Sequence, residues 1–180
     1  MKKLPIIILC VIIALGLLFF GIVQGAKNKA ITYEEQINES QSAIKVQEKR
    51  RADLIPNLVD CVKAYDKHEY ETLMAVVETR GVDSDDSVTE IQTMINAVAE
   101  AYPELKSNQN YKDLMDELSM TENSIANYRE NYNKQVKSYK KHIRSFPTSL
   151  FLGIAGYDAI EYEYLNFNVS EDAPTNLFND

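Results

Sequence analysis

The sequence predicts an all-α protein, in which an N-terminal transmembrane helix precedes an elongated antiparallel bundle of three to four helices. Two observations predict this fold class. An uncharged apolar run occupies the N-terminus, and apolar residues recur at steps of three, four or seven over most of the remaining chain. Strands are not predicted, because runs of β-branched residues outside the first segment are short and glycine is scarce in the middle of the chain.

The N-terminal apolar run extends from Leu4 to Val23 without a charged residue. As a helix that rises about 1.5 Å per residue, it is about 30 Å long, the thickness of a bilayer's hydrocarbon core. A cleaved signal peptide is the alternative, since Lys2 and Lys3 precede the run and small residues follow it. The run is longer than the apolar core of a signal peptide, about 15 residues, so we expect it to be retained as a membrane anchor.

The charges that flank the anchor give only a slight indication of its orientation. Lys2, Lys3 and the terminal amine lie before it, and Lys27 and Lys29 lie after it. Positively charged residues are enriched on the cytoplasmic side of a membrane span. The distribution slightly favours a single-pass protein of the cell membrane whose bundle lies on the extracytoplasmic side.

The next segment carries the apolar stripe of a long helix. The stripe begins at Ile37 and continues at helical spacing through Leu58 to Val77. Pro56 lies inside it, where proline lacks an amide hydrogen and its ring crowds the preceding turn. We therefore expect a helix kink or break at Pro56.

A turn and a second helix follow. Residues 81–86 are the clearest turn sequence in the chain, because they combine glycine, serine and three aspartates. Ser87 followed by Glu90 has the spacing of a capping box, which predicts the start of the next helix. Pro103 ends or bends that helix.

The longest predicted helix extends from Asn108 to Ser145, and Pro147 is the predicted helix stop. Such a helix is about 57 Å long, so long partner helices are expected to lie against it. Its apolar residues recur every seven positions, a spacing typical of coiled-coil packing. The recurring residues are Tyr111, Leu118, Ile125, Tyr132, Tyr139 and Phe146.

A short apolar segment and an acidic tail follow Pro147. The apolar segment, Leu150 to Tyr157, is expected to pack across the end of the bundle, and contact with the membrane surface is the alternative. From Asn166 onward the polar, acidic composition predicts disorder. The predicted domains are a membrane anchor at residues 1–26, a helical bundle at residues 27–157 and an acidic, disordered tail at residues 158–180.

Charge and motif patterns argue against several classes of function. The net charge is -8, and the densest basic cluster, around Lys49, is interleaved with acidic and apolar residues, so nucleic acid is not a predicted partner. His68 and His142 lack the neighbouring ligands of zinc and di-iron sites on helices. Cys61 has the spacing of a core residue rather than that of a nucleophile. We expect no enzyme activity, metal, cofactor or small-molecule substrate.

Three charged residues lie on apolar stripes and are predicted to point into the bundle. Arg51 is seven residues from both Ile44 and Leu58. Glu122 and Arg129 lie seven residues apart on the last long helix. Because a buried charge is costly unless it is paired, we predict a structural polar network that joins Arg51 to Glu122, with Arg129, and fixes the helix register. The alternative is a polar pocket for a small ligand.

Several motifs, in this order, resemble the LemA family of bacterial membrane proteins. They are Tyr33-Glu34-Glu35-Gln36-Ile37-Asn38, Arg50-Arg51-Ala52-Asp53-Leu54-Ile55-Pro56-Asn57-Leu58-Val59, Ala101-Tyr102-Pro103-Glu104-Leu105, Thr121-Glu122-Asn123-Ser124-Ile125, Tyr132-Asn133 and Ser145-Phe146-Pro147. The resemblance extends from the anchor to about Gly156 and implies a membrane segment followed by a helical bundle. It implies no reaction, because the family has no established biochemical activity. The chain departs from the family pattern at residues 81–86 and in its tyrosine-rich tail.

The predicted function is that of a membrane-anchored helical scaffold or interaction protein. Its long surface is expected to bind another membrane or envelope protein, whose identity the sequence leaves open. LemA-like proteins are often encoded near membrane metallopeptidases. The resemblance therefore also implies an alternative, an accessory or regulatory partner of such a peptidase or of an envelope-stress system.

Overall fold

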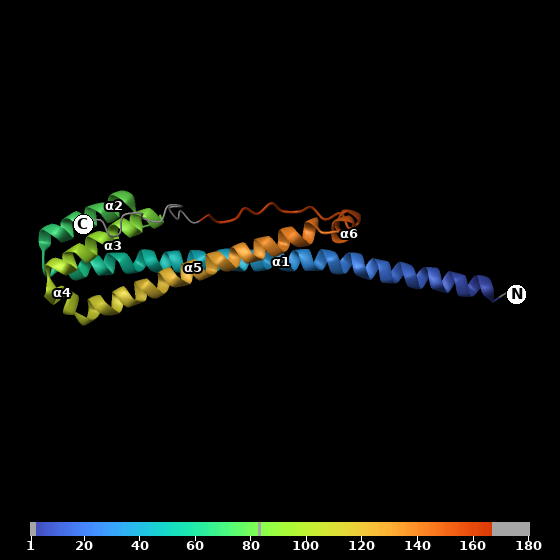
Figure 1. Ribbon diagram of the computed structural model, residues 1–180, viewed down its shortest axis with the longest axis horizontal. Helices are drawn as coiled ribbons and strands as arrows, with labels where there is room; N and C mark the ends of the chain where they lie inside the picture. The colour runs from blue at the N-terminus through green and yellow to red at the C-terminus, as the bar shows by residue number, and fades with distance from the viewer. Residues whose placement is uncertain (1–2, 83, 167–180) are drawn as a thin grey trace, which may run out of the picture. The chain divides into compact units, whose positions relative to one another are not determined.

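The computed structural model describes residues 3–82 and 84–166, and every regular element in these ranges is an α-helix (Figure 1). The helices are α1 (Leu4–Lys63), α2 (Lys67–Arg80), α3 (Asp85–Ala101), α4 (Pro103–Ser107), α5 (Gln109–Arg144) and α6 (Thr148–Ile154). The chain divides into unit 1, Met1–Glu34 with Tyr132–Asp180, and unit 2, Glu35–Asn131. The predicted all-α fold class is confirmed, whereas the predicted domain boundaries stay a prediction.

The first part of α1 is apolar and exposed to solvent. From Ile6 to Phe20 its large apolar side chains are all exposed. By length and composition, this part of α1 is able to cross a membrane. A helix that is apolar on every side is stable when protein or lipid surrounds it, and here no protein does so among the described residues.

α1 continues through Pro56 and ends at Lys63. The sequence predicts either a break or a kink at Pro56. The break is therefore absent, and the kink stays a prediction. The expectation that the same helix continues to Val77 is wrong. Asp66 begins a new helix, α2, because its Oδ1 accepts hydrogen bonds from the amides of His68 (2.8 Å) and Glu69 (3.0 Å).

The predicted turn at residues 81–86 joins α2 to α3. Gly81 ends α2 with a φ of 71°, which glycine adopts without strain. α3 begins at Asp85, and its N-cap is Ser84, whose Oγ accepts a hydrogen bond from the Ser87 amide at 3.1 Å. The predicted capping box at Ser87 and Glu90 is therefore wrong, because serine three positions earlier already caps the helix.

Unit 2 is a bundle in which the later part of α1 is antiparallel to the first part of α5. Residue numbers fall along α1 as they rise along α5: the Asn108 Nδ2 donates to the Tyr65 hydroxyl (3.1 Å), and the Asn131 Nδ2 donates to the Ser40 Oγ (3.1 Å). α2 and α3 pack beside them (Figure 1). The buried apolar core includes Leu54, Ile55, Leu58, Val59, Val62, Leu73, Val88, Ile91, Ile95, Val98, Leu105 and Leu118.

Unit 1 combines the first part of α1, the later part of α5, α6 and an extended segment. The extended segment includes residues 158–166, where the predicted tail begins. There the Ile160 amide donates to the Tyr139 hydroxyl, and Leu165 and Asn133 exchange two hydrogen bonds, each 2.9 Å long. Residues 167–180, on which most of the predicted disorder falls, lie outside the described residues.

The predicted seven-residue stripe of α5 is buried at its first five positions, Tyr111 through Tyr139. The sixth, Phe146, is 83% exposed, so its place in the stripe is wrong. The reason is that α5 ends at Arg144, and Pro147 then precedes α6. Within α6, Leu152 is buried, which agrees with the expected packing of this apolar segment.

Candidate functional site

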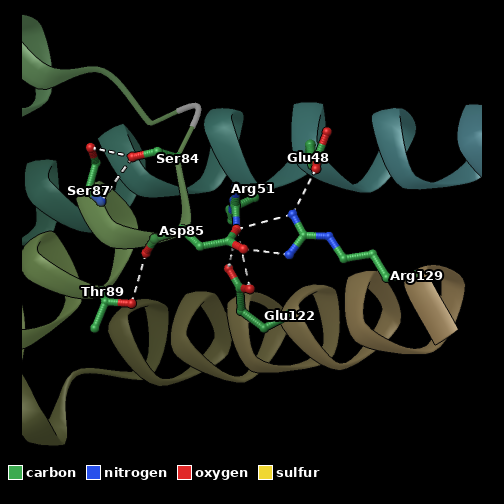
Figure 2. Close-up of polar contacts among 8 residues, drawn as sticks. All are labelled: Glu48, Arg51, Ser84, Asp85, Ser87, Thr89, Glu122 and Arg129. Atoms are coloured by element: carbon green, nitrogen blue, oxygen red, sulfur yellow. Dashed lines mark hydrogen bonds and ion pairs between the residues drawn. The ribbon is translucent and has the colours of Figure 1, made fainter. Parts of the chain in front are cut away.

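Arg51 is the largest fully buried side chain among the described residues, at 1% exposure. It lies on α1 in unit 2, and its Nη1 donates to carboxylates from two other helices. The distances are 2.8 Å to the Asp85 Oδ1 on α3 and 3.4 Å to the Glu122 Oε1 on α5 (Figure 2). A single guanidinium group therefore joins α1, α3 and α5.

Arg129 extends this network from α5. Its Nη2 donates to the Glu48 Oε1 at 3.0 Å, and its Nη1 donates to the Asp85 Oδ2. Figure 2 shows the Asp85 carboxylate between the two guanidinium groups. Hydrogen bonding to Arg129, and then to Arg51, lowers the pKa of Asp85 although partial burial opposes the shift. The contact with Asp85 raises the pKa of Arg129.

The start of α3 fixes the position of Asp85. Ser84 caps the helix, so Asp85 occupies its first turn, where the helix dipole favours a negative charge. The Thr89 Oγ1 donates to the Asp85 carbonyl oxygen at 2.8 Å, which adds a contact within the same turn. The first turn of α3 thus supplies a carboxylate that reaches the buried Arg51 guanidinium.

The structure brings together the three charged residues that the sequence singles out, but with different nearest partners. Arg51 lies closer to Asp85 than to Glu122, and Arg129 contacts Glu48 and Asp85. Sequence reasoning missed two carboxylates. Glu48 precedes Arg51 by three residues, a spacing on one helix face that could have revealed it. Asp85 lay in a predicted turn, where no periodicity indicates direction. The proposed role in helix register stays a prediction.

The balance of charge in this network favours a structural role over a pocket for an anionic ligand. Three carboxylates face two guanidinium groups, so the cluster carries no surplus positive charge for an anionic ligand. The Arg51 Nε and Nη2 have no hydrogen-bond partner among the described residues, although they are buried. Buried donors of this kind reduce the net stabilisation of the network.

A second polar cluster lies in unit 1 and was not predicted. The hydroxyls of Tyr139 and Tyr157 both donate to the Glu34 Oε1, the former at 3.3 Å, and they lie 3.0 Å from each other. Burial, together with the hydrogen bond to Glu34, raises the pKa of Tyr157 strongly. Burial also raises the pKa of Tyr139. Both hydroxyls therefore stay protonated and act as donors at neutral pH.

The histidines and Cys61 do not converge on a reactive site. His68 is exposed, whereas His142 is half-buried, with its Nε2 2.9 Å from the Ala26 carbonyl oxygen and its ring 5.6 Å from that of Tyr33. Burial raises the pKa of the Cys61 thiol, which disfavours a thiolate. In the ranges that the structure describes, no three His, Cys, Asp or Glu side chains are grouped to hold a metal ion.

The chain is similar to known proteins over most of its length. The model of the LemA family matches residues 40–178. Protein LemA of Metamycoplasma hominis is 29% identical over 182 aligned residues, which cover 91% of this chain and 83% of that protein. Magnetosome protein MamQ 2 of Paramagnetospirillum magneticum and magnetosome protein MamQ of Magnetospirillum gryphiswaldense are 36% and 33% identical over 66 residues, 37% of this chain and 24% of each relative.

Proposed function

The chain belongs to the LemA family, and from this membership we propose that it is a single-pass, membrane-anchored helical scaffold that binds another protein and catalyses no reaction itself. One observation carries the proposal: α1 changes character along its length. Its first part exposes only apolar side chains, and its last part supplies Leu54, Leu58 and Val62 to the core of unit 2. One helix therefore belongs both to the anchor and to the bundle.

The use of the polar side chains supports a scaffold rather than an enzyme. In unit 2 the guanidinium groups of Arg51 and Arg129 are both paired with carboxylates. In unit 1 the Glu34 carboxylate accepts hydrogen bonds from tyrosine hydroxyls. Groups engaged in this way stabilise helix contacts, whereas catalysis needs a pocket in which titratable groups converge on a substrate.

A groove in unit 2, formed by α3, α4 and α5, is the surface that we propose for a protein partner. It combines apolar and aromatic side chains with both signs of charge, which is the composition of a protein interface with an apolar centre and a polar rim. The lining residues are Asn96, Ala99, Glu100, Lys106, Tyr111, Lys112, Met115 and Asp116.

Photocrosslinking in cells tests the scaffold role. A photoreactive residue at Lys112, in the groove, is expected to give a discrete adduct with a membrane or envelope protein. The same residue at Ala126, an exposed position elsewhere on α5, is the matched control and should give none. An adduct with a membrane metallopeptidase would favour the accessory role. Absence of a discrete adduct at Lys112 would contradict the scaffold role, and an equal adduct at Ala126 would contradict binding through the groove.

The side of the membrane is tested by labelling intact cells with a membrane-impermeant thiol reagent. Ser84 caps α3, so a cysteine there would perturb the fold, and Ala126→Cys in a Cys10→Ala, Cys61→Ala background is preferable. We propose an extracytoplasmic bundle, so labelling is expected before lysis. Labelling only after lysis would place the bundle in the cytoplasm.

A further inference from the structure

α6 has a buried side and a large exposed apolar side. Leu152 is 4% exposed, whereas Leu150 and Ile154, four residues apart on one helical face, are 55% and 57% exposed. Phe146, just before the helix, is exposed as well. No charged residue occurs between Phe146 and Tyr157. A contiguous exposed apolar surface without charge marks a contact with another apolar phase.

Two contacts within unit 1 place α6 beside the membrane-spanning part of α1. The Phe151 ring lies edge-on to the Phe19 ring, with centroids 5.8 Å apart, and Figure 1 shows α6 against the early part of α1. At the end of α5, the His142 Nε2 lies 2.9 Å from the Ala26 carbonyl oxygen. The chain therefore meets α1 near Ala26, and α6 then reaches back toward Phe19.

These contacts set the depth of α6 relative to a bilayer. The apolar run of α1 ends at Val23, and Phe19 lies about 6 Å before this point along the helix axis. Amphipathic helices at membrane surfaces lie about 5 to 10 Å deep, at the boundary between headgroups and acyl chains. α6 is thus at the level of this boundary when α1 spans the bilayer.

Basic side chains lie just beyond the same level. Lys27 and Lys29 follow the apolar run on α1, and Lys141 and Arg144 lie in the last turn of α5. Lys29, Lys141 and Arg144 are exposed. Basic residues next to a membrane span attract the headgroups of anionic lipids.

We propose that α6 is a membrane-surface helix, an inference that rests on the membrane anchor proposed above. Phe146, Leu150 and Ile154 insert among the acyl chains of the leaflet on the bundle's side, and Lys141 and Arg144 contact anionic headgroups. Through the contact of Phe151 with Phe19, the exposed apolar side chains of α6 lie beside those of α1. The same bilayer therefore covers the apolar surfaces of α1 and α6, and lipid is the partner that we assign to the exposed face of α6.

Quenching of a single tryptophan by lipid tests the proposal, because the chain has no tryptophan of its own. The full-length variants Leu150→Trp, Leu17→Trp and Met120→Trp replace exposed apolar residues of α6, of the anchor and of unit 2, respectively. Each is reconstituted into vesicles whose phospholipids carry bromine on their acyl chains. We expect blue-shifted, strongly quenched emission from Leu150→Trp and Leu17→Trp, and unquenched emission from Met120→Trp.

The outcomes separate this inference from the anchor. Quenching of Leu17→Trp without quenching of Leu150→Trp overturns the membrane contact of α6 and leaves the anchor intact. Absence of quenching in Leu17→Trp overturns the anchor itself. Blue-shifted but unquenched emission from Leu150→Trp means that protein covers α6, for example a second copy of the chain, and also overturns the proposal.

The headgroup contact has its own test. Brominated phosphatidylglycerol is expected to quench Leu150→Trp more than brominated phosphatidylcholine at the same mole fraction. Adding Lys141→Gln and Arg144→Gln should remove this preference, whereas the control Lys112→Gln, in unit 2, should leave it unchanged. Equal quenching by the two lipids in the variant with both basic residues intact overturns the headgroup contact.

Discussion

The helices within each unit are joined by a different kind of polar contact. In unit 2 a buried guanidinium, that of Arg51, binds carboxylates from two other helices. In unit 1 the neutral hydroxyls of Tyr139 and Tyr157 donate to one carboxylate, that of Glu34. The first arrangement depends on opposite charges, and the second depends on donors that stay uncharged.

The difference teaches how each unit tolerates the loss of a partner. A buried cation cannot regain water when its carboxylates are removed, so the remaining charge is strongly destabilising. A hydroxyl carries no net charge, so its burial is less costly. Changes to unit 2 should therefore have larger effects than comparable changes to unit 1.

The largest effect is expected when Arg51 is left without carboxylates. Asp85→Ala with Glu122→Ala should lower the free energy of unfolding by about 3 to 5 kcal/mol, measured by urea denaturation of the full chain in detergent micelles. Arg51→Met should be milder, because the exposed Asp85 and partly exposed Glu122 regain water. The control Glu117→Ala removes the exposed pair with Arg50 and should cost about 0 to 1 kcal/mol.

Two outcomes would contradict this ranking. A double variant no less stable than Glu117→Ala would show that Arg51 rehydrates and that the network contributes little. An Arg51→Met variant as unstable as the double variant would assign the stabilisation to packing of the long side chain rather than to its charge.

The next largest effect is expected from Tyr139→Phe in unit 1. The change removes the hydroxyl that donates to Glu34 and accepts from the Ile160 amide, so it should cost about 1 to 3 kcal/mol. Hydrogen exchange should show faster exchange of the Ile160 amide. Tyr128→Phe, at an exposed position on α5, is the control. Equal effects of the two substitutions would show that the tyrosine cluster does not stabilise unit 1.

A smaller effect is expected from the cap that positions Asp85. Ser84→Ala removes the acceptor of the Ser87 amide and should cost about 1 kcal/mol, with faster hydrogen exchange in the first turn of α3. Ser87→Ala keeps the backbone donor and should cost less. The reverse order would favour the capping box that the sequence predicts at Ser87.

The sequence predicts α5 and its buried face well, but it misses the start of α2 and the polar contacts of unit 2. Apolar periodicity predicts each end of α5 within one residue of its observed position, because residues spaced like Leu118, Ile125 and Val136 share one face only in a helix. It does not reveal that Asp66 starts α2, since a single capping side chain outweighs a continuing stripe. Apolar periodicity identifies Arg51 as buried. It does not predict the contact with Asp85, because that contact depends on the conformation of the turn before α3, and turn sequences show no apolar periodicity.

The pH dependence of stability should differ between the units. Asp85 has a pKa lowered in the folded state, so its contribution is present above its unfolded value of about 3.9 and is lost as pH falls through the folded pKa. Tyr157 has a raised pKa, so its contribution is present below its unfolded value of about 10 and is lost as pH rises through the folded pKa. Acid should therefore weaken unit 2, and alkali should weaken unit 1.

The acid effect is the smallest that we predict, at most about 1 kcal/mol, because the Asp85 side chain is about half exposed and its ion pairs are screened by solvent. Urea denaturation between about pH 7 and pH 3 should give a shallower loss of stability for Asp85→Asn than for the unchanged chain. Tyr157→Phe should leave this acid slope unchanged and flatten the alkaline one. If Tyr157→Phe alters the acid slope as much as Asp85→Asn does, the two clusters are coupled, and the contrast between an ionic unit 2 and a neutral unit 1 fails.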